Sequence, residues 1–360
     1  MPSKKMTAQN SIVQTDIFYM ARAIQLAKKG MYTSSPNPYV GCVIVKDNQT
    51  IAEGFTQVAG QAHAEVHALK NATQSVANAT AYVTLEPCSH TGKTPPCADA
   101  LIKAGISRVV IAMLDPNPKV SGNGVKKLSD AGIEVIVGVL EEQARTLNRG
   151  FFKRMEKGLP FVRIKMAMSL DGKTAMASGE SQWITGSEAR YDVQRLRAQA
   201  DAILTGSGTV LDDDPSLNVR IKPRDISLEN KEITELKQPL RVVLDSDLKI
   251  NKSAKMLGLS GKTLIYTCNP DSPKIQQLNQ KNTEVKVLAE TKIVLNQVLE
   301  DLAQREINEI HVEAGATLCG ALLEAQCVDE IVIYMAPTIL GGDAKSLFNL
   351  PQLNLSLIHI

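Results

Sequence analysis

Strand-like and helix-like segments alternate along this 360-residue chain, and that alternation limits the fold more than any other feature. We expect strands at 40–45, 50–54, 81–85, 109–113, 134–139, 161–168, 202–205, 241–245, 263–267, 309–313 and 331–335. We expect helices at 16–29, 63–72, 99–104, 124–131 and 141–157, and a polar surface loop at 221–240. Such alternation predicts layered α/β architecture.

A break near the middle of the chain predicts two domains. Gly158-Leu159-Pro160 ends the charged helical segment, and a new strand pattern starts at Phe161. A length of 360 residues also suits two domains, since a domain averages about 150 residues. We therefore expect domains at 1–157 and 158–360.

Composition argues against several classes of protein. Lys+Arg 40 and Asp+Glu 38 leave a net charge of 40 − 38 = +2, which does not suit a general nucleic-acid or membrane-surface binder. No apolar run approaches the ~20 residues of a membrane span. The N-terminal MPSKKMTAQNSIVQTD lacks the apolar core of a secretory signal, so we expect a short frayed arm there. Six scattered cysteines predict a reducing, cytoplasmic compartment.

One histidine and two cysteines of the first half have the chemistry of a zinc site. His63 opens a predicted helix, and Cys88 and Cys97 follow a predicted buried strand. These three ligands leave the fourth position of zinc to water, as in catalytic sites, and such water ionises near neutral pH. Glu65 follows His63 by two residues, so we expect it to transfer protons in the same pocket. His-x-Glu followed by Pro-Cys is typical of zinc nucleobase deaminases.

The spacing leaves other interpretations open. Eight residues, SHTGKTPP, separate Cys88 from Cys97, where nucleobase deaminases usually have Cys-x-x-Cys. We expect His90 and Lys93 of this insert to reach an anionic part of the substrate. A closed structural zinc site would need a fourth protein ligand, which His67 or His90 could supply. Otherwise His67 is a core histidine beside the site.

Four segments resemble one enzyme family: PNPYVGCVIV, HAEVHAL, VTLEPCSHTGKTPPC and DPNPKVSGNG. They are similar to the deaminase domain of the bifunctional deaminase/reductase of riboflavin biosynthesis, a cytidine-deaminase-like, three-layer domain. The resemblance implies hydrolytic removal of the 2-amino group of a diaminopyrimidinone that bears ribose 5-phosphate. It implies one zinc ion per chain on His63, Cys88 and Cys97, Glu65 as the proton shuttle, and a substrate pocket lined by Asn37, His90, Lys93 and Asp115. Thr56 stands where many family members have histidine.

The second half resembles the reductase half of that family, which has a dihydrofolate-reductase-like α/β fold. The similar segments are KMAMSLDGK, GESQWIT, LTGSGTVLDDDPSLNVR and IHVEAGATLCGALLE. The resemblance implies NADPH reduction of the ribosyl side chain. The implied NADPH-binding positions are Lys165, Ala167, Trp183, Thr209, Asp213, Ser246, Gly315, Ala316 and Thr317. The implied substrate-binding positions are Ser181, Arg197, Leu217, Arg220 and Glu313.

Residue chemistry alone supports part of this second site. A strand ends and a helix begins around Gly315, and free N–H groups there suit a cofactor phosphate. Arg197 and Arg220 suit a substrate phosphate, although arginines are more often solvated surface charges. The plainer interpretation of the Gly315 segment is a simple turn.

We therefore expect a bifunctional enzyme that makes two successive riboflavin precursors, and a homo-oligomer, either a dimer or a tetramer. Three alternatives remain: a deaminase fused to an inactive reductase-like domain, an RNA base deaminase, and a zinc-stapled scaffold. The first is motivated by the ending LPQLNLSLIHI, because family members continue through at least one more strand.

Overall fold

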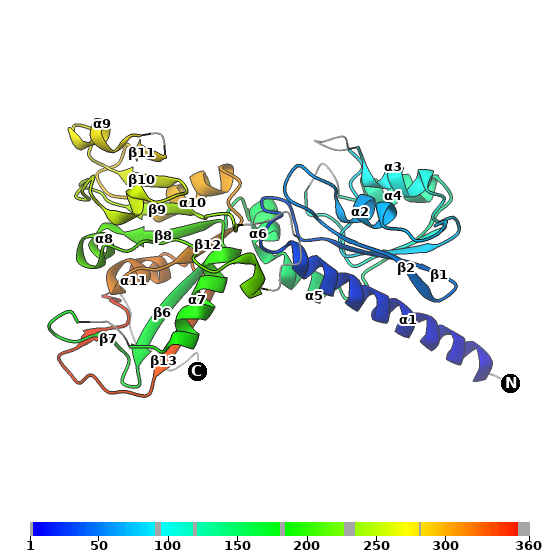
Figure 1. The fold of residues 1–360 in the computed structure, drawn as a ribbon, viewed down its shortest axis with the longest axis horizontal. Helices are drawn as coiled ribbons and strands as arrows, with labels where there is room; N and C mark the ends of the chain where they lie inside the picture. Colours follow the sequence, from blue (N-terminus) through cyan, green and yellow to red (C-terminus); the bar gives the residue numbers. More distant parts are fainter. Residues whose placement is uncertain are drawn as a thin grey trace. The chain divides into compact units, whose positions relative to one another are not determined.

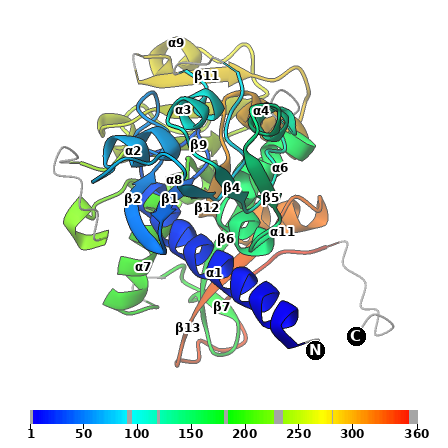
Figure 2. The ribbon, with the colours of Figure 1, turned by 90° about the vertical axis from the view of Figure 1, so that its right-hand side faces the viewer.

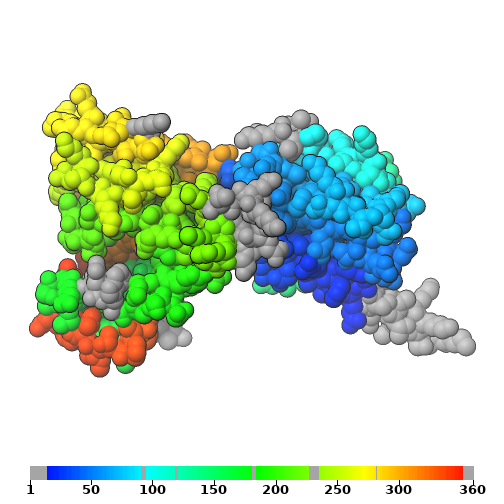
Figure 3. Space-filling view, viewed as in Figure 1, coloured from blue at the N-terminus to red at the C-terminus, as the bar shows by residue number. Residues whose placement is uncertain are grey.

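The computed structural model describes residues 3–90, 95–117, 121–180, 184–226, 235–280 and 282–351, with side chains from residue 14 onward. The chain divides into two compact units, Met1–Lys157 and Gly158–Ile360. Each unit is one continuous stretch of chain, which the colours of the space-filling view follow (Figure 3). Among the described helices, none is long and apolar enough to cross a membrane.

The first unit is a five-stranded sheet with helices on both faces (Figures 1 and 2). Its strands are β1 (Gly41–Lys46), β2 (Gln49–Phe55), β3 (Thr80–Val83), β4 (Arg108–Ile111) and β5 (Glu134–Val137). Its helices are α1 (Ser3–Ala27), η1 (Lys28–Gly30), α2 (Ala64–Lys70), α3 (Cys97–Lys103), α4 (Asn123–Asp130), α5 (Glu141–Leu147) and α6 (Arg149–Lys157). The strand order is β2-β1-β3-β4-β5, with β1 antiparallel to β2 and β3 and the other pairs parallel. Since α1 covers one face and α2, α3 and α4 the other, the predicted three-layer arrangement is confirmed.

Two glycines let helices lie directly on the strands of this sheet. A Cβ on Gly41 of β1 would lie 1.9 Å from the carbonyl oxygen of Ala23 in α1. A Cβ on Gly54 of β2 would lie 2.3 Å from the carbonyl oxygen of Ala64 in α2. A larger residue at Gly54 would therefore displace the start of α2, which is where the predicted catalytic residues begin.

Two predictions for this unit are wrong. The predicted single helix over 141–157 is two helices, separated at Asn148. The reason is a tertiary contact: the Asn148 amide accepts a hydrogen bond from the Tyr39 N–H at 2.7 Å and donates to the Tyr39 carbonyl at 2.9 Å. The predicted frayed arm at the N-terminus is instead part of α1, which begins at Ser3.

The second unit is built on a seven-stranded sheet in which every pair of neighbouring strands is parallel. Its strands, in spatial order, are β11 (Thr283–Val287), β10 (Thr263–Thr267), β9 (Leu240–Leu244), β8 (Ala202–Gly206), β12 (Glu309–Val312), β6 (Phe161–Ser169) and β13 (Glu330–Ala336). Its helices are α7 (Ser187–Gln199), α8 (Ser207–Asp213), η2 (Pro223–Ile226), η3 (Lys255–Gly258), α9 (Lys274–Leu278), α10 (Leu295–Gln304) and α11 (Ala316–Glu324). A separate antiparallel pair joins β7 (Lys173–Ala175) to β14 (Lys345–Ser346). This confirms the predicted α/β class.

Helices cover both faces of the seven-stranded sheet. Ile203 of β8 joins Val210 of α8 in one apolar cluster, and Leu204 joins Leu322 of α11 in another. Successive residues of a strand point to opposite faces, so α8 and α11 lie on opposite sides of the sheet. The adjacent strands β8 and β12 thus lead to helices on opposite faces. In open α/β sheets, ligands bind at such a switch point, beyond the carboxyl ends of the strands.

Candidate active sites

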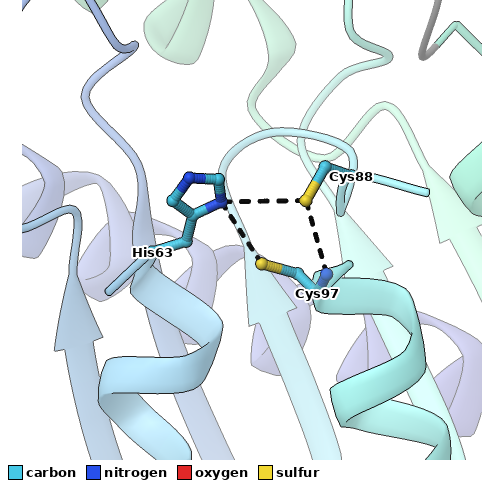
Figure 4. Close-up of side chains that lie close together, drawn as sticks. All are labelled: His63, Cys88 and Cys97. Atoms are coloured by element: carbon cyan, nitrogen blue, oxygen red, sulfur yellow. Dashed lines mark hydrogen bonds between the residues drawn. The ribbon is translucent and has the colours of Figure 1, made fainter. Parts of the chain in front are cut away.

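Three ligand atoms of the first unit lie close together, as Figure 4 shows. His63 caps the start of α2, Cys88 follows β3, and Cys97 is the first residue of α3. The His63 Nδ1 lies 3.7 Å from the Cys88 Sγ and 3.4 Å from the Cys97 Sγ. Zinc bonds of about 2.3 Å to sulfur and about 2.0 Å to nitrogen, at tetrahedral angles, separate those atoms by about 3.5 Å. The three side chains therefore fit zinc.

Hydrogen bonds favour the thiolate form of Cys88, and the hydrogen bond between the two cysteines raises the pKa of Cys97. The Cys97 thiol and the His63 ring both lower the pKa of Cys88. The backbone N–H of Cys97, at the start of α3, also donates to the Cys88 Sγ at 3.3 Å (Figure 4). Thiolate sulfur is the form that binds metal, so Cys88 is prepared to bind a cation.

Glu65 lies in the first turn of α2, beside this cluster, and is 3% exposed. Burial, together with the negative charge of Cys88, raises the pKa of Glu65 to about 7. A carboxyl group with this pKa exchanges its proton near neutral pH, which is what a general acid–base catalyst requires.

The cluster opens into a hollow whose empty space, including the part open to solvent, is about 710 Å³. Its walls comprise Asn37, Pro38, Val40, Thr56, His63, Glu65, Leu85, Glu86, Cys88, His90, Asp115, Asn117 and Phe151. Of the predicted deaminase substrate residues, Asn37, His90 and Asp115 line it, and Lys93 lies outside the described residues. Burial raises the pKa of Asp115 to about 6.

Glu86, Asn117 and Phe151 are among the wall residues that were not predicted site residues. Glu86 and Asn117 lie in the motifs LEPC and DPNP, and an acidic residue at the end of an apolar strand was the available signal. Phe151 comes from α6, where no motif indicated a role. Thr56 lines the hollow, and its hydroxyl accepts a hydrogen bond from the Val40 N–H at 3.1 Å.

The alternative fourth ligand His67 is engaged elsewhere. Its Nδ1 accepts a hydrogen bond from the Phe55 N–H at 3.3 Å, and its ring also contacts the amides of Gln57 and Asn71. Within the residues that the structure describes, the close group of ligand atoms comprises His63, Cys88 and Cys97. This arrangement leaves the fourth position of a tetrahedral zinc ion open.

We expect Cys88→Ser to remove zinc from the first unit. A serine hydroxyl does not ionise at neutral pH, so a charged ligand is lost. Removing even an outer hydrogen-bond partner of a metal ligand costs about 10–100-fold in affinity, and loss of a ligand should cost more. Metal analysis after dialysis against a chelator measures the effect. Cys268→Ser, in the second unit, is the matched control and should keep its zinc. Equal zinc in both variants would contradict the assignment.

The second unit gathers most of its predicted site residues at one edge of its sheet. Lys165 and Ala167 lie in β6, Thr209 and Asp213 in α8 after β8, Ser246 after β9, Glu313 after β12, Gly315 at the N-cap of α11, and Ala316 and Thr317 in the first turn of α11. This edge includes the switch point between β8 and β12. The predicted Ser181 and Trp183 lie outside the described residues.

Arg197 and Glu313 form a buried ion pair beside this edge. The Arg197 Nε and Nη2 donate to the two Glu313 carboxylate oxygens at 2.5 and 2.8 Å, and its Nη1 donates to the Asn218 carbonyl at 3.0 Å. The guanidinium fork of Arg197 is thus directed at a carboxylate. Arg220 is exposed and donates to the Asn218 side chain at 3.1 Å. Leu217, which is buried, belongs to the same loop.

Comparison with known proteins assigns both halves of the chain. Residues 13–113 match the cytidine and deoxycytidylate deaminase zinc-binding region, and residues 160–360 match the RibD C-terminal domain. The riboflavin biosynthesis protein RibD of Escherichia coli K12 is 50% identical over 341 residues, which cover 94% of this chain and 92% of the relative. The chain belongs to the RibD family. The RibD protein of Haemophilus influenzae is 49% identical over 341 residues, covering 94% and 90% of the two chains.

Solved structures of RibD proteins have the same fold. One form of Acinetobacter baumannii RibD is 46% identical, covers 96% of this chain and 93% of its own, and superposes with a TM-score of 0.87. The deaminase/reductase of Thermotoga maritima is 36% identical, covers 97% and 93%, and has a TM-score of 0.83. This RibD family member therefore contains a zinc-binding deaminase domain and a reductase domain, and its cofactors are zinc and NADPH.

Proposed function

We propose that residues 1–157 deaminate 2,5-diamino-6-(5-phosphoribosylamino)pyrimidin-4(3H)-one and that residues 158–360 reduce the product to 5-amino-6-(5-phosphoribitylamino)uracil. The observation that carries the first assignment is a buried Glu65 beside the His63, Cys88 and Cys97 cluster, in a hollow open to a small molecule. The deaminase/reductase from Thermotoga maritima carries both activities in its name. Because all six cysteines are free, we place the enzyme in the reducing cytoplasm. We also propose a homo-oligomer, either a dimer or a tetramer, because reductase domains of this style often pair.

In the deaminase, the residues of the chain transfer protons and hold the ring. Zinc on His63, Cys88 and Cys97 supplies Lewis-acid polarisation of a water molecule. Glu65 accepts a proton from the attacking water at a carboxylate oxygen while the water oxygen bonds to C2 of the ring. Glu65 then delivers the proton to the 2-amino group, and the bond from C2 to nitrogen breaks to release ammonia. A pKa of about 7 lets the same carboxyl group perform both transfers near neutral pH.

The remaining wall residues then orient the pyrimidine. Asn37 and Asp115 present polar groups to the ring, and His90 lies where the phosphoribosyl group can extend toward solvent. Lys93 follows His90 closely in the chain, and we propose that it also contacts the substrate.

In the reductase, NADPH supplies the reducing equivalents, and the chain binds and orients both molecules. Gly315 caps α11, a helix of 9 residues whose first N–H groups suit a cofactor phosphate. Lys165, Ala167, Trp183, Thr209, Asp213 and Ser246 complete the proposed NADPH site, with Ala316 and Thr317. Ser181, Leu217, Arg220 and Glu313 bind the substrate, and Arg197 holds the Glu313 carboxylate.

Arg220→Ala should weaken substrate use by the reductase. Arg220 is the exposed arginine of this loop, so we assign it the substrate phosphate. A hydrogen bond to a charged group contributes about 1.5–3 kcal/mol, which corresponds to a rise in KM of about 10–100-fold. Affinity for NADPH should change little, because its phosphate is assigned to the start of α11. Steady-state kinetics with each substrate in turn separate the two effects. An unchanged KM for the pyrimidine would place the phosphate elsewhere.

Ammonia release without NADPH tests the deaminase assignment and separates it from RNA deamination. The purified chain should release ammonia from the free diaminopyrimidinone nucleotide and none from RNA oligonucleotides. Release from RNA alone would favour the base-deaminase alternative. A chain that holds zinc but acts on neither would favour the scaffold alternative.

A further inference from the structure

Glu86 joins two segments of the deaminase hollow. It follows β3, and its side chain is buried, with the residue 3% exposed. Its Oε1 accepts hydrogen bonds from the backbone N–H groups of Gly124 at 2.8 Å and Val125 at 3.1 Å. Its Oε2 accepts from the N–H groups of Asp115 at 3.2 Å and Gly122 at 3.0 Å. One carboxylate thus holds both ends of the segment between β4 and α4.

These four bonds use the acceptor capacity of the carboxylate. Two oxygens offer about four lone-pair positions, and four N–H donors occupy them. The negative charge also lies at the start of α4, a helix of 8 residues, where the helix dipole favours an anion. Although Glu86 lines the hollow, its oxygens are therefore committed to the backbone and are not available to a substrate.

The position of Asp115 depends on this contact. Asp115 lines the hollow, and its backbone N–H is one of the four donors. Its side chain in turn accepts a hydrogen bond from the Asn117 N–H at 2.8 Å, so a shift of Asp115 would carry Asn117 with it. The start of α4 packs closely against the segment that holds Glu86. A Cβ on Gly124 would lie 2.1 Å from the Pro87 carbonyl oxygen and 3.1 Å from the Glu86 side chain.

We propose that Glu86 is a positioning residue of the deaminase, which holds Asp115 and Asn117 against the pyrimidine by anchoring the backbone between β4 and α4. The proposal rests on the proposed function, in which Asp115 binds the substrate. It assigns Glu86 no contact with the reacting atoms.

Glu86→Gln is the direct test, because glutamine keeps the shape and replaces one acceptor oxygen by a donor that faces N–H groups. The KM of the deaminase should rise about tenfold or more, since displacement of a positioned group by about 1 Å can cost on the order of 100-fold. The kcat and the zinc content should stay near wild type, because Glu65 and the zinc ligands lie outside the anchored segment. Glu142→Gln, exposed on α5, is the control and should match wild type.

A double-mutant cycle with Asp115→Asn distinguishes positioning from general stability. If Glu86 acts through Asp115, then Glu86→Gln should raise KM by less than about threefold in the Asp115→Asn background. An equal effect in both backgrounds would overturn the proposal, as would an unchanged KM in the single variant.

Two further measurements keep the test decisive. If Glu86→Gln does not fold, Gly124→Ala tests the proposal instead. The added Cβ pushes the start of α4 away from the Pro87 carbonyl oxygen, while the Glu86 carboxylate remains in the chain. A normal KM in Gly124→Ala would then overturn the proposal. Amide hydrogen exchange at Gly124 and Val125 should accelerate in Glu86→Gln whatever the activity, and unchanged exchange would also overturn it. Absence of ammonia release by the wild type, with accelerated exchange in the variant, would contradict the proposed function alone.

Discussion

Glu65→Gln should abolish deamination and leave both zinc and reduction intact. The amide has nearly the shape of the carboxyl group but cannot carry a proton between water and the leaving amine. General acid–base catalysis contributes about 10²–10⁴-fold, and Glu65 is assigned both proton transfers, so the loss of kcat should reach at least that range. Ammonia release from the diaminopyrimidinone nucleotide measures it.

Two other properties of the same variant, its zinc content and its reductase activity, serve as controls. Zinc content should remain that of the wild type, because the cluster of His63, Cys88 and Cys97 is unchanged. Reduction of pre-deaminated substrate should be unaffected, since that site lies in the other unit. Deamination within about threefold of the wild type would show that Glu65 is not the proton carrier.

Arg197→Ala should destabilise the second unit strongly. The side chains of Arg197 and Glu313 are 10% and 14% exposed, so the alanine variant leaves a buried carboxylate without its cation. Removal of one partner of a buried pair costs about 3–5 kcal/mol. Chemical denaturation measures this free energy of unfolding. The transition of the second unit is the one that NADPH moves to a higher denaturant concentration, because NADPH stabilises the unit that binds it. Arg224→Ala, whose side chain is 79% exposed, should change it by less than about 0.5 kcal/mol.

The pH dependence of that difference has a definite sign. Burial would raise the pKa of Glu313, but Arg197, with a smaller contribution from His311, outweighs burial and holds it well below its usual range. In the wild type, this pair therefore adds stability above the unfolded pKa of Glu313, and the stability is lost as the pH falls through the folded pKa. In Arg197→Ala, burial raises that pKa and the variant loses stability as the pH rises. The two proteins should thus differ most at neutral pH and less in acid. A constant difference would contradict this account.

Much of the fold could be predicted because buried parallel strands are short apolar runs. The strands β8, β9 and β10 lie within a residue or so of their predicted bounds. The edge strand β11, with the sequence TEVKV, was missed because it is half exposed and its alternating residues are charged. The break at Asn148 was missed because its cause, the Tyr39 backbone, is 109 residues away.

The residues of the two candidate sites also divide into those that a local sequence pattern indicates and those whose contacts lie far away in the sequence. The zinc ligands and Glu65 lie in short motifs whose chemistry and spacing indicate a metal site, so residue types sufficed. The role that we assign to Glu86 depends on N–H groups up to 39 residues away. The Arg197 fork meets a carboxylate 116 residues away, a contact that sequence alone did not indicate. Local pattern does not record such contacts.

We propose that one chain performs both reactions in order. The most direct measurement follows ammonia release and NADPH oxidation together, on the purified wild-type chain and the diaminopyrimidinone nucleotide, with the product identified by mass. We predict ammonia release with or without NADPH, followed by oxidation of one NADPH for each ammonia and formation of the ribitylamino-uracil phosphate. Ammonia release without any NADPH oxidation would contradict the claim and show that the reductase domain does not turn over.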